Sequence, residues 1–189
     1  MLKLGKLSVG HEGNATVSFS SDGNESTKGG TTYTINRWGK IVSSIGCNGD
    51  SCDVVMVGSS SYRCETSLSI EDYSYGYGQK GTQIKNGDYG LFKFLADNTD
   101  VEWGAMYSGG LNPSDSTSCL LQTSHNNGEC HVSFCWSDFD TFVHSHPEDG
   151  RQSATESDEK TKDIMLGKSQ NKVTNFGVYL TKSRTVISF

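Results

Sequence analysis

Two histidines and an aspartate near the end of the chain have the types and spacing of a metal site. His144 and His146 are separated by one residue, and Asp158 follows after a polar stretch. Residues at i and i+2 of a strand point to the same face, so both imidazoles can reach one ion about 2 Å away. Two neutral imidazoles and one carboxylate leave Zn²⁺ with a net positive charge and an open position for water. That pattern is typical of catalytic rather than structural zinc.

Three local features must position these ligands. Pro147 ends the strand that carries the histidines, and the polar segment 148–154 gives the chain room to turn. Thr155 is a good N-cap, and the residues after it are acidic, as in the first turn of a helix. The sequence therefore predicts a helix from Glu156 to about Lys168, with Asp158 facing the ion from its first turn.

The segment from His144 to Asp158 resembles the JAMM (MPN-plus) metallopeptidase signature, an upstream glutamate followed by H-[ST]-H-P-x7-S-x-x-D. It departs only at Thr155, where the family usually has Ser. With ordinary residue frequencies, a chain of this length would show the pattern by chance at a rate on the order of 10⁻⁵ or below. The resemblance implies zinc-dependent hydrolysis of a peptide or isopeptide bond, with His144, His146 and Asp158 as metal ligands.

The same resemblance implies a glutamate that takes a proton from the attacking water as general base. Glu102 is the candidate, because it lies in an apolar strand pattern where a carboxylate is costly to bury without a partner. Glu129 is the reserve choice, and Glu148 ranks below both. Thr155 takes the place of the serine that stabilises the oxyanion in the family. Its hydroxyl is expected to donate to substrate, to cap the helix, or to alternate between these tasks.

A second set of motifs resembles the JAB-like toxin domain of bacterial Rhs-type polymorphic toxins. The motifs are LFKFLADNTDVEW at residues 91–103, Thr-Ser-His at 123–125 and Thr-Tyr-Thr-Ile-Asn at 32–36. The resemblance covers about residues 31–189. It implies an effector that damages a competing or host cell, and a cognate immunity protein that neutralises it in the producer.

Composition and charge narrow the classes of partner. The 189 residues suffice for one domain with a full core, and a formal net charge of −6 without a Lys/Arg cluster excludes a nucleic-acid surface. No apolar stretch approaches the roughly 18 to 20 residues that span a bilayer, and the start lacks the apolar run of a signal peptide. We expect a secreted or delivered effector without its own signal peptide that acts in the target cell.

The elements around the site predict a mixed α/β protein with α+β character. We expect a JAMM/MPN-like, mainly antiparallel sheet with a flanking helix or helices, preceded by a small β-rich region. The predicted divisions are a flexible lead-in at 1–30, a β-rich N-terminal region at 31–85 and a JAMM-like metallopeptidase domain at 86–189. Alternating patterns and short apolar runs predict strands, and a Gly/Tyr-rich stretch predicts a loop or edge region at 71–90. The strands are expected at 31–45 as a hairpin, and at 53–57, 64–70, 101–107, 120–123, 131–135, 139–146 and 176–189, the last as a terminal hairpin. Residues 89–97 fit either a strand or a short helix.

Several residues have more ordinary interpretations. The six cysteines, whose disulfide pairing stays open, lack the paired C-x2-C spacing of a zinc cluster. His125 and His131 are expected to be structural or surface histidines. The tyrosines of the Gly/Tyr stretch either line a substrate groove or lie on a sheet edge. Two other functions compete with a peptidase: a non-catalytic MPN-like module that binds protein, and a metal-dependent hydrolase toxin that acts on a non-peptide bond.

Overall fold

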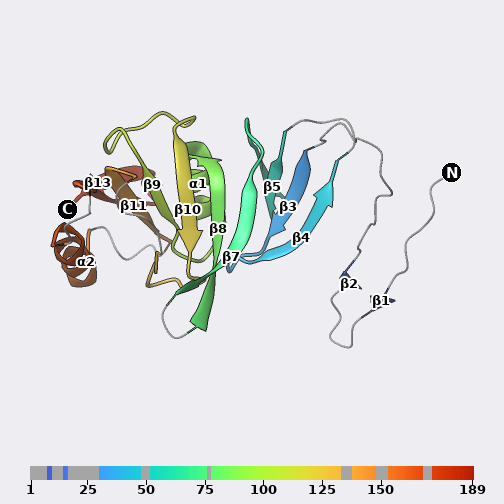
Figure 1. Ribbon diagram of the computed structural model, residues 1–189, viewed down its shortest axis with the longest axis horizontal. Coiled ribbons are helices and arrows are strands. Elements are labelled where there is room, and N and C mark those ends of the chain that lie inside the picture. The colour runs from blue at the N-terminus through green and yellow to red at the C-terminus, as the bar shows by residue number, and fades with distance from the viewer. Residues whose placement is uncertain are drawn as a thin grey trace.

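The computed structural model describes residues 8–9, 15–16, 30–47, 52–75, 78–132, 138–147, 153–167 and 172–189. In this part of the chain the strands form a seven-stranded, a four-stranded and a two-stranded sheet, and there are two helices. Figure 1 shows the seven-stranded and four-stranded sheets next to each other, with the second helix at the far end. This mostly sheet architecture with two helices confirms the predicted fold class. The predicted lead-in lies mainly outside the described residues, which there form the antiparallel pair β1 (Ser8–Val9) and β2 (Ala15–Thr16).

The seven-stranded sheet has the order β13-β12-β11-β9-β10-β8-β7. Its strands are β7 (Ser69–Tyr75), β8 (Gln79–Asp88), β9 (Gly104–Tyr107), β10 (Ser118–Thr123), β11 (Thr141–His146), β12 (Asn175–Leu180) and β13 (Thr185–Ser188). All neighbours pair antiparallel except β11 and β12, which are parallel. The predicted terminal hairpin is confirmed as β12 and β13.

The four-stranded sheet has the order β4-β3-β5-β6. Its strands are β3 (Thr31–Ile35), β4 (Ile41–Gly46), β5 (Val54–Val57) and β6 (Ser60–Arg63). The predicted hairpin at 31–45 is confirmed by the antiparallel pair of β3 and β4. The strand predicted at 64–70 is wrong for residues 64–68. There the amide of Leu68 donates to the Asp53 carboxylate at 2.6 Å, so this backbone group bonds to a side chain instead of a neighbouring strand.

Of the loop or edge region predicted at 71–90, the loop is wrong, because these residues supply most of the β7–β8 hairpin and the start of a helix. Strand β7 does lie at an edge of the seven-stranded sheet. Strand β8 buries the polar side chains of Thr82 and Gln83, and Gln83 donates to Glu71 of β7 at 2.8 Å. A strand that buries polar groups by pairing them shows no alternation of hydrophobic residues. The loop was predicted because the stretch shows no alternation of hydrophobic residues, and the paired polar side chains explain why that alternation is missing.

Helix α1 (Tyr89–Asn98) resolves the stretch that fitted either a strand or a helix. Asp88 caps it, accepting from the Leu91 amide at 2.7 Å. The helix buries Leu91, Phe92 and Leu95 in a cluster that also takes residues from both large sheets. That core therefore continues across residue 85, and the division of the chain at that point stays a prediction. No helix of the described residues is long and apolar enough to cross a membrane.

The two faces of the seven-stranded sheet carry different clusters. Along β9, Ala105 joins the cluster of α1, whereas Met106 joins a second cluster with Phe142 and Met165. Met165 belongs to α2 (Glu156–Leu166), which begins as predicted but ends two residues before Lys168. Because side chains alternate along a strand, the second cluster and α2 share the face opposite to α1.

Of the two segments predicted as the strands 101–107 and 131–135, the first is a strand only from Gly104, and His131 and Val132 lie outside any strand.

Candidate metal centre

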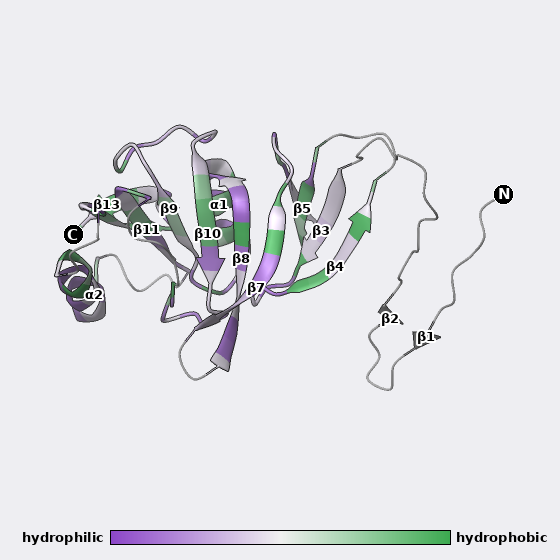
Figure 2. Ribbon diagram, in the orientation of Figure 1, coloured by the Kyte–Doolittle hydropathy of each residue, from purple (hydrophilic) through white to green (hydrophobic). Residues whose placement is uncertain are grey.

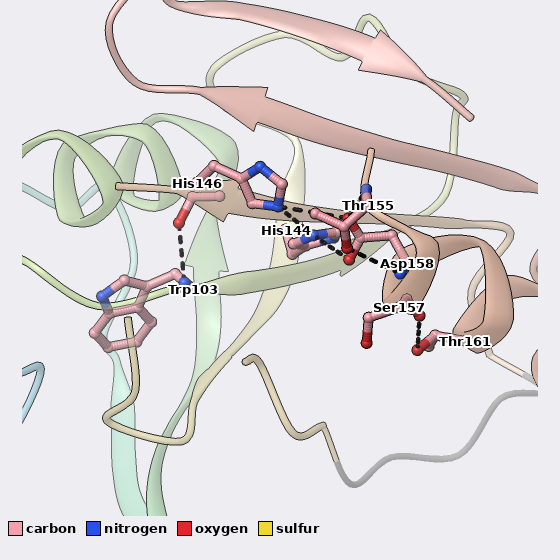
Figure 3. A network of polar contacts seen from close by, with 8 residues as sticks. Trp103, His144, His146, Thr155, Ser157, Asp158 and Thr161 are labelled. Atoms are coloured by element: carbon pink, nitrogen blue, oxygen red, sulfur yellow. Dashed lines mark hydrogen bonds and ion pairs between the residues drawn. The ribbon is translucent and has the colours of Figure 1, made fainter. Parts of the chain in front are cut away.

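The three predicted ligands come together at the end of β11. His144 Nε2 lies 3.1 Å from Asp158 Oδ1, and His146 Nε2 lies 3.6 Å from Asp158 Oδ2. The two Nε2 atoms are 3.2 Å apart, and the ligand atoms of all three residues lie within 4.8 Å of one another. Figure 3 shows the side chains of His144, His146 and Asp158 converging from the strand and from α2. The i, i+2 spacing on a strand thus places both rings on one face, as the sequence predicts.

The chemistry of this donor set suits a divalent cation of the zinc type. Burial lowers the pKa of His144, which favours the neutral imidazole that a metal needs. Burial alone would raise the pKa of Asp158, but hydrogen bonds from His144 and His146 lower it well below its ordinary value. A carboxylate and two facing ring nitrogens are electron-rich groups at close range, and an ion between them would satisfy all three. Among the described residues, neither Nδ1 has a hydrogen-bond partner, whereas both Nε2 atoms lie near the Asp158 carboxylate.

Thr155 is the N-cap of α2 and forms a capping box with Asp158. Its hydroxyl donates to Asp158 Oδ2 at 2.8 Å and accepts from the Asp158 amide at 3.3 Å. Its own amide donates to the same carboxylate oxygen at 2.6 Å. Of the tasks expected for this hydroxyl, the structure shows capping, and the same hydroxyl also contacts the Asp158 carboxylate. Its action on an oxyanion stays a prediction.

Glu102 lies two residues before β9, the strand that pairs with β11 and its histidines. β9 pairs with β11 so that Gly104 lies opposite His144, and Trp103 exchanges hydrogen bonds with Ser145 at 2.9 and 3.0 Å. Continuing this register sets Glu102 opposite His146, on the same face of the sheet. The residue is 3% exposed and lines a cavity together with His144 and Asp158. Of the two candidate glutamates that the structure describes, Glu102 therefore occupies the buried position beside the histidines, whereas Glu129 is exposed.

The cavity has a volume of about 150 Å³ and two walls. One wall is the segment Gly128–His131, which includes the reserve candidate Glu129. The other is the first half of α2, with Ser157, Asp158 and Thr161. Glu129 is at the mouth, with a side chain that is 62% exposed and an Oε2 atom 3.0 Å from His131 Nε2. The third candidate, Glu148, lies outside the described residues.

Among the wall residues, the sequence singled out Glu129 and Asp158 but not Ser157 or Thr161. His131, expected to be structural or at the surface, is 51% exposed and also borders the cavity. The signal available was spacing: Ser157 and Thr161 are four residues apart on one helix face, and Tyr73 and Tyr75 are two apart on one strand face. Both tyrosines point toward the wall, where the Tyr73 hydroxyl donates to the His131 carbonyl.

The remaining residues with ordinary interpretations are structural. His125 Nδ1 lies 2.9 Å from the Trp38 carbonyl oxygen, and its Nε2 lies 3.4 Å from Thr82 Oγ1. No disulfide joins any two of the five described cysteines, and Cys135 lies outside the described residues. Burial raises the pKa of Cys119 above its ordinary value, as expected for an inert core thiol.

Comparisons with known proteins agree with the location of this centre. None of the curated proteins or solved structures compared with the chain matches it. A family model described as JAB-like toxin 1 matches residues 81–171. The matched range begins in β8 and extends past α2, so it holds both walls of the cavity and the residues Glu102, His144, His146 and Asp158. Over the part that carries its candidate metal centre, the chain is therefore similar to JAB-like toxin domains.

Proposed function

We propose that this protein is a toxin or effector that hydrolyses a peptide or isopeptide bond with the help of zinc. The observation that carries the proposal is the convergence of His144 Nε2, His146 Nε2 and the Asp158 carboxylate beside a cavity that Glu102 also lines. Similarity to JAB-like toxin domains supports the biological setting, in which the effector is delivered and a cognate immunity protein protects the producer.

In this proposal His144, His146 and Asp158 hold the metal, and Glu102 moves the proton. A bound zinc would polarise the substrate carbonyl and make a water nucleophilic near neutral pH. The Glu102 carboxylate accepts the proton of the attacking water and later delivers it to the leaving amine. Its 3% exposure keeps bulk water away from that carboxylate. Thr155 orients Asp158 and is proposed to contribute its hydroxyl to the oxyanion during the reaction.

Zinc content and cleavage by three variants test the proposal. We expect wild type to carry about one zinc per chain, and His146→Ala to lose it, because two remaining ligands bind zinc weakly. Glu102→Gln should keep the zinc and lose roughly 100-fold or more in kcat, the contribution typical of a general base. His125→Ala is the matched control, because that ring bonds to the Trp38 carbonyl away from the centre and its loss should leave zinc content unchanged.

The measurements are elemental analysis of the purified chains and product analysis on a mixed panel of peptides and isopeptides. Wild type without zinc, or equal zinc in wild type and His146→Ala, would contradict the metal assignment and favour a non-catalytic binding module. Zinc without cleavage of any peptide or isopeptide would favour a hydrolase for another bond. If Glu102→Gln kept full activity while Glu129→Gln lost it on every substrate, Glu129 would be the general base.

A further inference from the structure

The side chains that line the cavity are mostly polar or charged, unlike those of a hydrophobic specificity pocket. Phe142 is the one large apolar side chain among the described residues that line the cavity, and it lies stacked against His144 with ring centroids 5.8 Å apart. Ser157 and Thr161 contribute polar groups on the helix side. A bulky apolar side chain of a substrate would find little surface to bury here.

Glu129 is held in a defined position at this mouth. Its carboxylate is 3.0 Å from His131 Nε2, and the His131 ring is stacked on Tyr75 with centroids 5.0 Å apart and planes 15° apart. The Ser124 hydroxyl donates to the Glu129 carbonyl at 2.6 Å, and the Tyr75 hydroxyl donates to the Ser124 carbonyl at 3.0 Å. The two hydrogen bonds hold the backbone at Glu129 and Ser124 in place, and the His131 ring, stacked on Tyr75, contacts the Glu129 carboxylate before any substrate arrives.

Two glycines allow the wall to sit this close to the sheet. A Cβ on Gly104 would lie about 3.0 to 3.1 Å from Phe142, Val132 and Cys130 Sγ, so a larger residue there would push these neighbours away from β9 by a few tenths of an ångström. A Cβ on Gly81 would collide with the ring of Tyr73, its cross-strand partner, which crosses there to reach the His131 carbonyl. Cys130 packs against β9, whereas its neighbours Glu129 and His131 are exposed at the cavity mouth.

The charges around the cavity leave one carboxylate in excess once a metal is bound. Three carboxylates line it, those of Glu102, Glu129 and Asp158, and none of the described lining residues is Lys or Arg. The two positive charges of a zinc ion would be balanced by Asp158 and Glu102. The Glu129 carboxylate then remains at the mouth with the His131 ring as its described partner, and its 62% exposed side chain lets it contact an incoming substrate as well.

We propose that Glu129 is a specificity-determining residue that selects substrates with a cationic group next to the scissile bond, such as a lysine side chain. The inference rests on the proposed function, because it assigns the substrate class of the same centre. Glu129 contacts the flanking group and leaves the reacting atoms to other residues. Its loss should therefore raise KM for cationic substrates and leave kcat unchanged.

Matched substrates test this assignment. The probes are internally quenched peptides and isopeptides that are identical except for Lys, Ala or Glu next to the scissile bond, on either side. We expect zinc-loaded wild type to prefer Lys by roughly tenfold in kcat/KM, as for one well-placed charged hydrogen bond. Glu129→Gln should lose that preference through KM alone, and Glu129→Lys should reverse it in favour of Glu.

Glu159→Gln is the matched control, because Glu159 is an exposed acid of α2 that does not line the cavity, and its removal should leave the preference unchanged. Equal kcat/KM for all three flanking residues in wild type would overturn the inference while leaving the proposed function standing. A uniform fall in kcat for Glu129→Gln would overturn it in favour of a catalytic role. Zinc-loaded wild type that cleaves none of the probes would overturn the proposed function and the inference together.

Discussion

The two walls of the cavity are held in place by very different means. The segment Gly128–His131 is tied to the sheet by Ser124 and by the two tyrosines of β7, through hydrogen bonds and a stacked ring. Helix α2 instead has Met165 as its one buried residue, whereas Ile164 and Leu166 are 55% and 51% exposed. Figure 2 shows α2 mostly in the colours of hydrophilic residues. One wall is thus part of the sheet, and the other is attached at a few points.

The points that attach α2 include the candidate metal centre itself. Asp158 contacts both histidines from the first turn, and Lys162 lies over the ring of Phe189 with its Nζ 5.8 Å from the centroid. A metal that joins Asp158 to His144 and His146 would therefore also tie α2 to β11. The wall Gly128–His131 is thus held in place by the sheet before any metal binds. We expect metal binding to fix the position of the other wall, the first half of α2.

The largest effect is expected from removing the apolar attachment of α2. Met165→Ala should lower the free energy of unfolding by about 2 to 5 kcal/mol, because it leaves a cavity in the second core cluster. Urea denaturation of the metal-free chain measures this, with Leu166→Ala as the matched control at a half-exposed position, expected to change stability by about 0.5 kcal/mol or less. Equal destabilisation by both substitutions would show that α2 is attached differently.

Zinc should then distinguish the two walls. At a free concentration about 100 times the dissociation constant, a metal that binds only the folded state adds about 2.7 kcal/mol. Hydrogen exchange with and without zinc should show the larger gain in protection in α2 and the smaller gain in residues 124–132. His146→Ala should abolish the gain. Equal protection of both walls would remove the distinction between a preformed and a completed side.

The smallest expected effect concerns the wall tied to the sheet. Tyr75→Phe removes the hydroxyl that donates to the Ser124 carbonyl at 3.0 Å but keeps the ring stacked on His131. We expect a loss of about 1 kcal/mol, the usual net value of one hydrogen bond. Exchange of the amides in 124–132 should speed up while that of α2 stays unchanged. A change confined to α2 would contradict the assignment of Tyr75 to this wall.

Local patterns in the sequence predicted several elements correctly. The alternation around residues 31–45 predicted the β3–β4 hairpin, and the cap at Thr155 predicted where α2 begins. These features depend on residues close in the chain, whose preferences act without help from distant partners. The strands β7 and β8 were not predicted as a hairpin, since their strand character comes from pairing with each other and from the pairing of β8 with β10.

The candidate centre also combines features that local sequence predicts with features that depend on contacts between distant residues. The sequence by itself determined that His144 and His146 share a face and that Asp158 stands in the first turn of a capped helix, because both follow from local periodicity. Only the tertiary structure decided that Glu102 lies opposite His146 and that Glu129 borders the mouth on a wall braced by β7. Those placements result from strand register and from contacts between residues far apart in the chain. Short-range patterns do not encode such contacts.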